Sequence, residues 1–83
     1  MITKGLHDLG VSVLTQAKQD FGATPRGNLT ATEIAQARSF ILGHTEVDRY
    51  WLHHWCALAE MMPETVMQWG CEQLVEEAAC ALN

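Results

Sequence analysis

Three side chains of metal-binding type lie close together in the sequence, because His53, Cys56 and Glu60 follow the pattern H-x2-C-x3-E. Residues three and four apart share one side of a helix, so this spacing predicts that the three side chains project together. Imidazole, thiolate and carboxylate groups are all zinc ligands. One helix supplies too few of them, and the fold would have to add others. The remaining candidates are His7, His44, Cys71 and Cys80. We therefore expect no bound metal, and zinc-dependent regulation stays the third hypothesis for the function.

The neighbours His53 and Cys56 also have the residue types of Cys–His catalysis, which needs an exposed thiolate of low pKa beside a base. Proximity in sequence is weak support for such a dyad. The chain has no glycine-rich phosphate loop, no HExxH and no GxSxG motif. His54 falls on an apolar helix face, which predicts a hydrogen-bonded core histidine. We expect neither enzyme activity nor a cofactor.

Cysteine usage predicts a reducing environment. The three cysteines are odd in number and lie within helical patterns, which favours free thiols buried as small hydrophobic residues. The N-terminal residues lack the charged start, apolar segment and cleavage site of a signal peptide. No apolar run approaches the roughly 20 residues that span a bilayer. We expect a soluble cytoplasmic protein without a membrane segment.

The elements that position these side chains are helices, and the most apolar one is predicted over residues 45–62. At about 100° per residue, one of its faces is apolar and carries most of its bulk, and we expect that face to be buried. It contains Val47, Trp51, His54, Leu58 and Met62, with Tyr50, Trp55 and Met61 beside it. Leu52, Cys56 and Ala59 lie round the other side. The remaining polar stripe is narrow, so neighbours must cover this helix on several sides.

Start and stop signals predict three further helices. Residues 2–21 carry apolar side chains at spacings of three and four. Gly5 and Gly10 each weaken this helix by about 1 kcal/mol relative to alanine, and the alternative interpretation of Gly10 is a close approach to a neighbouring helix. After a Gly- and Pro-rich loop at 22–29, Thr30 and Glu33 have the spacing of a capping box, and Gly43 is a helix stop. Thr45 can cap the central helix, and Pro63 suits the first position of the last one.

These elements predict an all-α fold, built as a single small domain over residues 1–83. The helices are expected near 2–21, 30–43, 45–62 and 63–82. Four helices on short connections form either an antiparallel bundle or a more irregular helical globule.

Charge is distributed unevenly along the chain. Residues 1–49 contain all five bases and five acids, whereas residues 50–83 contain five glutamates and no Lys or Arg. The whole net charge of −5 therefore lies in the second part. A helix-turn-helix over 56–74 would present this acidic part to DNA, and DNA affinity depends on neutralising phosphates. We expect no direct nucleic acid binding.

The last helix carries the predicted partner-binding residues. On its apolar face lie Met67, Gly70, Leu74, Val75 and Ala78 together with Cys71, Ala81 and Leu82. Trp69 points away from that face in the predicted phase, and a tryptophan among glutamates on an outer surface is typical of an interface anchor. The predicted partner-binding set is Trp69, Glu72, Gln73, Glu76 and Glu77.

The leading hypothesis is a small acidic module that binds a protein partner with a basic surface. Its sharpest form is an inhibitor or regulator of a nucleic-acid-handling protein, of the kind that bacteriophages and other mobile elements encode against host functions. The alternative is a structural module, either a homo-oligomeric bundle such as a homodimer or a subunit of a permanent assembly. In the first case a protein partner is captured by charge, and in the second apolar surface is buried between subunits.

Overall fold

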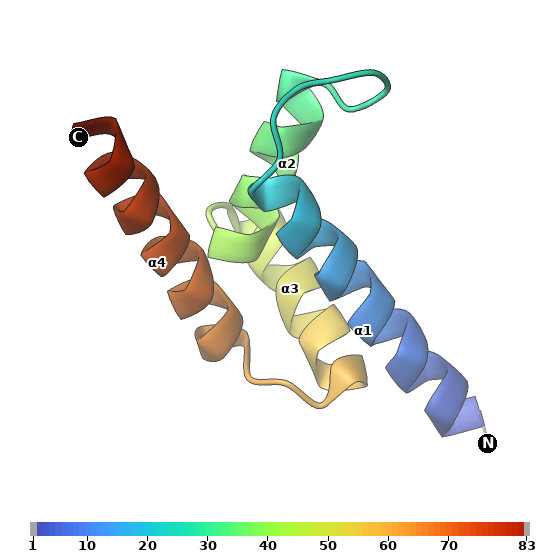
Figure 1. Cartoon of the computed structure of the whole chain (residues 1–83). Helices are drawn as coiled ribbons and strands as arrows, with labels where there is room; N and C mark the ends of the chain where they lie inside the picture. Colours follow the sequence, from blue (N-terminus) through green and yellow to red (C-terminus); the bar gives the residue numbers. More distant parts are fainter. Residues whose placement is uncertain (1, 83) are drawn as a thin grey trace.

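The computed structural model describes residues 2–82, and the side chains of residues 5–80. The chain forms four helices, α1 (Ile2–Phe21), α2 (Ala31–Leu42), α3 (Glu46–Ala59) and α4 (Pro63–Leu82). In the described residues they are joined by turns and by one isolated bridge between Arg26 and Leu29, without a strand. The predicted all-α class is confirmed. Helices α1, α2 and α3 pack together, and α4 lies beside them (Figure 1).

Local side-chain chemistry sets the ends of α2 and α3. Thr30 has extended backbone and its hydroxyl accepts a hydrogen bond from the Glu33 N–H at 3.1 Å. The reciprocal capping box forms instead at Thr45, where the Asp48 N–H donates to the Thr45 hydroxyl and Asp48 accepts from the Thr45 N–H. Gly43 ends α2 in the left-handed region with φ 59°, as its sequence position predicts.

The central helix ends earlier than expected. Ala59 is its last residue, because Glu60 adopts the left-handed conformation with φ 57°. The Met61 N–H then donates to the Cys56 carbonyl at 2.9 Å, which satisfies one of the carbonyls left open at the helix end. Residues 60–62 form the link to α4, which begins at Pro63.

The core takes side chains from all four helices. Its buried members are Leu14, Phe21, Ile41, Leu52, Cys56, Ala59 and Val66. Its members from α3 are Leu52, Cys56 and Ala59, which lie on the side opposite the face that was expected to be buried. The predicted buried face of α3 is therefore wrong: Val47, Tyr50, Trp51 and Met62 are exposed.

Close approach of α1 explains the phase of α3. A Cβ atom on Gly10 would lie 2.9 Å from the Ala59 nitrogen and 3.0 Å from the Trp55 carbonyl oxygen. The Leu58 Cβ atom lies 3.0 Å from the same point, so the two helices leave no room for a bulky side chain between their backbones here. The bulky side of α3 cannot fit there, and it turns toward solvent. The expected close approach at Gly10 is present.

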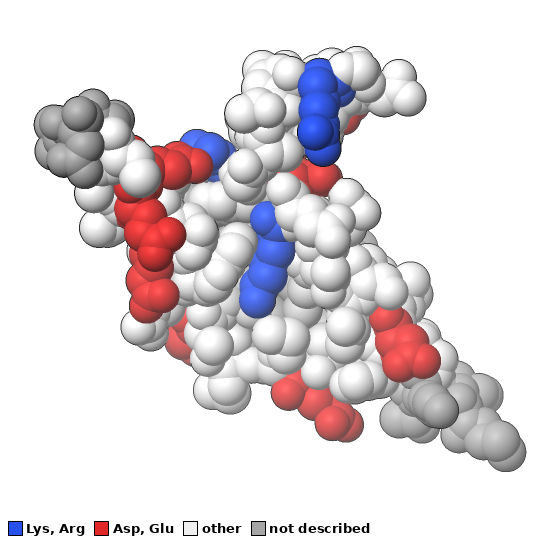
Figure 2. All heavy atoms as spheres, viewed as in Figure 1, with Lys and Arg blue, Asp and Glu red and all other residues white. Residues whose placement is uncertain are grey.

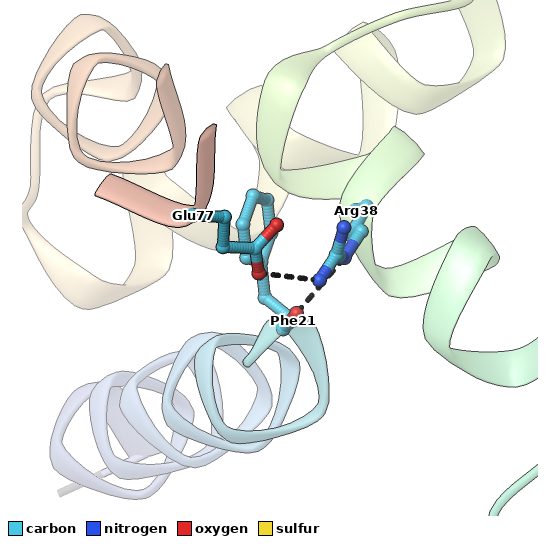
Figure 3. Close-up of polar contacts among 3 residues, drawn as sticks. All are labelled: Phe21, Arg38 and Glu77. Carbon is cyan, nitrogen blue, oxygen red and sulfur yellow. Dashed lines mark hydrogen bonds and ion pairs between the residues drawn. The ribbon is translucent and has the colours of Figure 1, made fainter. Parts of the chain in front are cut away.

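Besides its core side chain Val66, helix α4 is held against the other helices by close packing at Gly70 and by an ion pair further along. At Gly70, a Cβ atom would lie 2.9 Å from side-chain carbons of both Ile41 and Leu42 on α2. Further along, the Arg38 guanidinium donates to the Phe21 carbonyl at 3.0 Å and to the Glu77 carboxylate at 2.6 Å (Figure 3). Arg38 thus joins α2 to the C-terminal end of α1 and to α4.

Candidate partner-binding surfaces

Trp69 does not face outward as the sequence predicted. Its indole is half-buried and packs edge-on against Phe21, with ring centroids 5.4 Å apart. The Lys18 ammonium lies 5.1 Å from the centroid of the same ring, within the range of a cation–π contact. The expected orientation is wrong because the inner face of α4, centred on Val66 and Gly70, includes Trp69 at its border. Trp69 is therefore no exposed anchor.

The other predicted partner-binding residues divide between the two sides of α4. Glu77 forms the ion pair with Arg38, and Gln73 is half-buried. Glu72 and Glu76 are exposed, and Glu72 accepts a hydrogen bond from Gln68 at 3.2 Å. Glu72 and Glu76 are therefore available to a partner, whereas the charge of Glu77 is already neutralised by Arg38.

The exposed side of α4 combines these acids with apolar groups. A shallow hollow of about 400 Å³ lies along it, and we call this the α4 outer surface; its residues are Gln68, Cys71, Glu72, Val75 and Glu76. Val75 is 68% exposed, although the sequence placed it on the buried face. Acidic side chains follow one another along α4, at the left edge of Figure 2. No Lys or Arg occurs in this helix.

A second hollow, which the sequence did not predict, lies where α1, α2 and α3 meet. We call it the aromatic groove: it has a volume of about 540 Å³, and Phe40, Trp51 and Trp55 line it together with the small side chains Val13, Ala17 and Ala37. Asp20, Glu33 and Asp48 stand in the same lining, with Gln16 and Gln36. The close approach at Gly10 was the sequence signal that could have revealed it, since it requires the small side of α3 to face α1.

The aromatic side chains of α3 form a continuous series. Tyr50 with Trp51, Trp51 with His54, and His54 with Trp55 are each in edge-to-face contact, at centroid distances of 5.1, 5.5 and 5.0 Å. His54 is exposed, so its predicted role as a core histidine is wrong. Two members of this series, Trp51 and Trp55, line the aromatic groove.

Asp48 carries a fixed negative charge into the groove. Burial alone would raise the pKa of this carboxyl, but hydrogen bonds from the Ser39 hydroxyl at 2.5 Å and from Thr45 outweigh it, with a contribution from the His44 charge. The pKa of Asp48 is therefore lowered. The side chain remains ionised at neutral pH and cannot take up a proton there to relieve the charge of the groove.

The proposed zinc ligands do not come together. Cys56 is fully buried, whereas His53 and Glu60 lie at the surface, so the three residues do not share one side of α3. Within the described part of the chain, no three His, Cys, Asp or Glu side chains are grouped as a metal site would require. Burial, and then the nearby Glu64 charge, raise the pKa of the Cys56 thiol, while Lys18 lowers it less. Such a thiol is a poor nucleophile.

The remaining cysteines are exposed and free. Cys71 lies on the α4 outer surface and Cys80 near the end of that helix, so the expected burial holds only for Cys56. None of the helices among the described residues combines the length and the apolar character needed to cross a membrane.

Comparison with known proteins assigns no class to this arrangement of helices and surfaces. No protein-family model, no curated protein and no solved structure matches the chain. The inferences about function therefore come from the geometry and charge of the two surfaces.

Proposed function

We propose that this protein is a binding module for another protein with a basic surface, and that the α4 outer surface is its docking site. One observation carries the proposal: Glu72 and Glu76 flank exposed Cys71 and Val75 on a helix without a single Lys or Arg. Apolar groups beside acids of one sign favour a partner with the opposite charge.

The charge balance within α4 supports the proposal. Arg38 already neutralises Glu77, whereas Glu72 and Glu76 are exposed on a helix without Lys or Arg, so the outer side of α4 keeps its negative charge. Such a surface repels phosphate groups and attracts Lys and Arg side chains. Many nucleic-acid-handling proteins expose basic surfaces, and an inhibitor or regulator of such a protein is the sharpest form of this function.

Reversing the exposed charges is expected to abolish partner capture. The tagged protein is expressed in its native host and captured at increasing salt, beside the double variant Glu72→Lys/Glu76→Lys. We expect wild type to retain a basic partner at low salt and to lose it as salt rises, and the variant to retain none, because the attraction becomes repulsion. Quantitative mass spectrometry of the captured proteins measures both effects.

A matched control separates this surface from net charge. Asp8 and Glu46 are exposed on α1 and α3, so Asp8→Lys/Glu46→Lys changes the charge equally away from α4. This control should capture the partner as wild type does. Equal loss in both double variants, or capture of acidic partners alone, would refute the proposed docking site.

Self-association is the second candidate function, and exposed Leu74 and Val75 favour it. Packing two α4 outer surfaces together would bring Glu72 and Glu76 of both copies close to each other without a compensating base. Like charges at that distance oppose association, which is why a basic partner is the preferred occupant. Light scattering distinguishes the two: the binding module is a monomer, and the structural module a tight dimer.

A further inference from the structure

We propose that the aromatic groove is a second docking site, which binds a basic amphipathic helix of a partner protein. Its lining residues come from α1, α2 and α3 and none from α4, so this site is separate from the α4 outer surface. The helix would lay apolar side chains on Trp51, Trp55 and Phe40 and direct Lys or Arg toward the acids of the lining. This inference goes beyond the function proposed above and does not depend on it.

The lining aromatics provide the apolar contact. Trp51 is 45% exposed, and Trp55 and Phe40 are half-buried at its side. Phe40 and Trp55 pack against the core while Trp51 remains open, so the groove has a firm floor and one accessible indole. Tryptophans in such settings dominate the binding energy of protein interfaces, and they also attract cations to the ring face.

The negative charge of the groove lining favours a positively charged occupant. Among the residues that the structure describes, the lining contains Asp20, Glu33 and Asp48 but no Lys, Arg or His. Asp48 is held in the capping box and contributes a fixed charge, whereas Glu33 is exposed and able to reach a ligand. An amphipathic helix in an apolar groove is a common mode of recognition, and here its polar side must be basic.

A second copy of the chain is a poor occupant, because most of its described bases are already engaged. Lys18 lies over Trp69, Arg38 pairs with Glu77, and Arg49 donates to the Gly43 carbonyl at 3.1 Å. Arg26 is exposed and lines the adjoining hollow with Asp20 and Glu33. It is therefore a weak internal competitor for a basic ligand, and it does not lie on an apolar helix face.

Three synthetic peptides of about 14 residues, close to four helical turns, test the proposal. The first peptide has leucines three and four residues apart, on one helix face, and lysines on the other face. The second has glutamate in place of each lysine, and the third has serine in place of each leucine. Each is titrated into isotopically labelled protein while the three indole N–H resonances are followed by NMR. We expect only the leucine–lysine peptide to shift the Trp51 and Trp55 resonances in a saturable way, with Trp69 unchanged.

Variants of the protein locate the peptide. Trp51→Ala should weaken binding at least about tenfold. Glu33→Lys should weaken it about tenfold at low salt, and Glu46→Lys should not, although both residues are exposed in the first turn of a helix. Arg26→Ala should strengthen it.

The double variant Glu72→Gln/Glu76→Gln separates the two surfaces, because it should leave the Trp51 and Trp55 shifts intact. The groove proposal is overturned if these shifts are absent, if they also occur with the serine–lysine or leucine–glutamate peptide, or if Glu33→Lys has no effect. It is also overturned if light scattering shows a dimer that Trp51→Ala converts to a monomer, since a second copy would then fill the groove.

Discussion

Replacing Gly10 by alanine is expected to destabilise the protein, whereas the same change at Gly5 is expected to stabilise it. Both glycines lie in α1, where alanine is favoured over glycine by about 1 kcal/mol. At Gly5 a new Cβ meets nothing within 4 Å, so Gly5→Ala should raise the free energy of unfolding by up to this full amount. At Gly10 it meets backbone atoms of Trp55 and Ala59, which cannot turn aside as a flexible side chain would.

The expected size follows from overpacking. Extra methyl groups in a packed contact cost about 1–3 kcal/mol, and the rigid backbone neighbours place Gly10 toward the upper end of this range. After the helical gain of about 1 kcal/mol, Gly10→Ala should lower the free energy of unfolding by up to about 2 kcal/mol. An 83-residue chain has about 4–12 kcal/mol in total, so the loss is readily measured by urea unfolding. Equal stabilisation by both substitutions would show that α1 does not approach α3 at Gly10.

Leu52→Ala and Trp51→Ala are expected to act on different properties of the protein, although the two residues are adjacent. Leu52 is fully buried in the core, and its truncation should cost about 2–5 kcal/mol of unfolding free energy through lost contacts and a cavity. That loss approaches the total stability of so small a protein. Trp51 is 45% exposed, and its truncation should cost about 1 kcal/mol or less.

This pair reports directly on the rotation of α3. One residue turns a helix by 100°, so only one of the two neighbours can face the core. Urea unfolding of both variants, with circular dichroism as the probe, gives the two free energies. The reverse order, with Trp51→Ala the more damaging, would restore the face that the sequence favoured and would remove the aromatic groove.

The fold class was predictable because its signals are local. Thr45, Gly43 and Pro63 act through hydrogen bonds and backbone conformations within a few residues, and each marks a helix end in the structure. The end of α3 at Glu60 was not predictable in this way, because a non-glycine residue in the left-handed conformation carries no strong sequence signal.

The candidate surfaces were less predictable because they depend on helix rotation. Helix α3 is apolar nearly all round, and periodicity cannot decide which of two apolar sides is buried. The contact at Gly10 decides it, and this is a property of two helices together. Periodicity also fails to fix the rotation of α4 closely enough to place Trp69. This residue lies at the border of the inner face, where a small rotation of the helix decides whether the indole is exposed or packs on Phe21.

Both surfaces depend on one arrangement, in which α3 buries Cys56 while α4 turns Cys71 and Cys80 outward. Alkylation of the native protein with iodoacetamide, followed by intact-mass spectrometry and peptide mapping, tests this directly. We predict rapid modification of Cys71 and Cys80, and modification of Cys56 only after denaturant is added, because its thiol is buried and its pKa is raised. Modification of all three cysteines at one rate, or protection of Cys71 in the native protein, would contradict the arrangement.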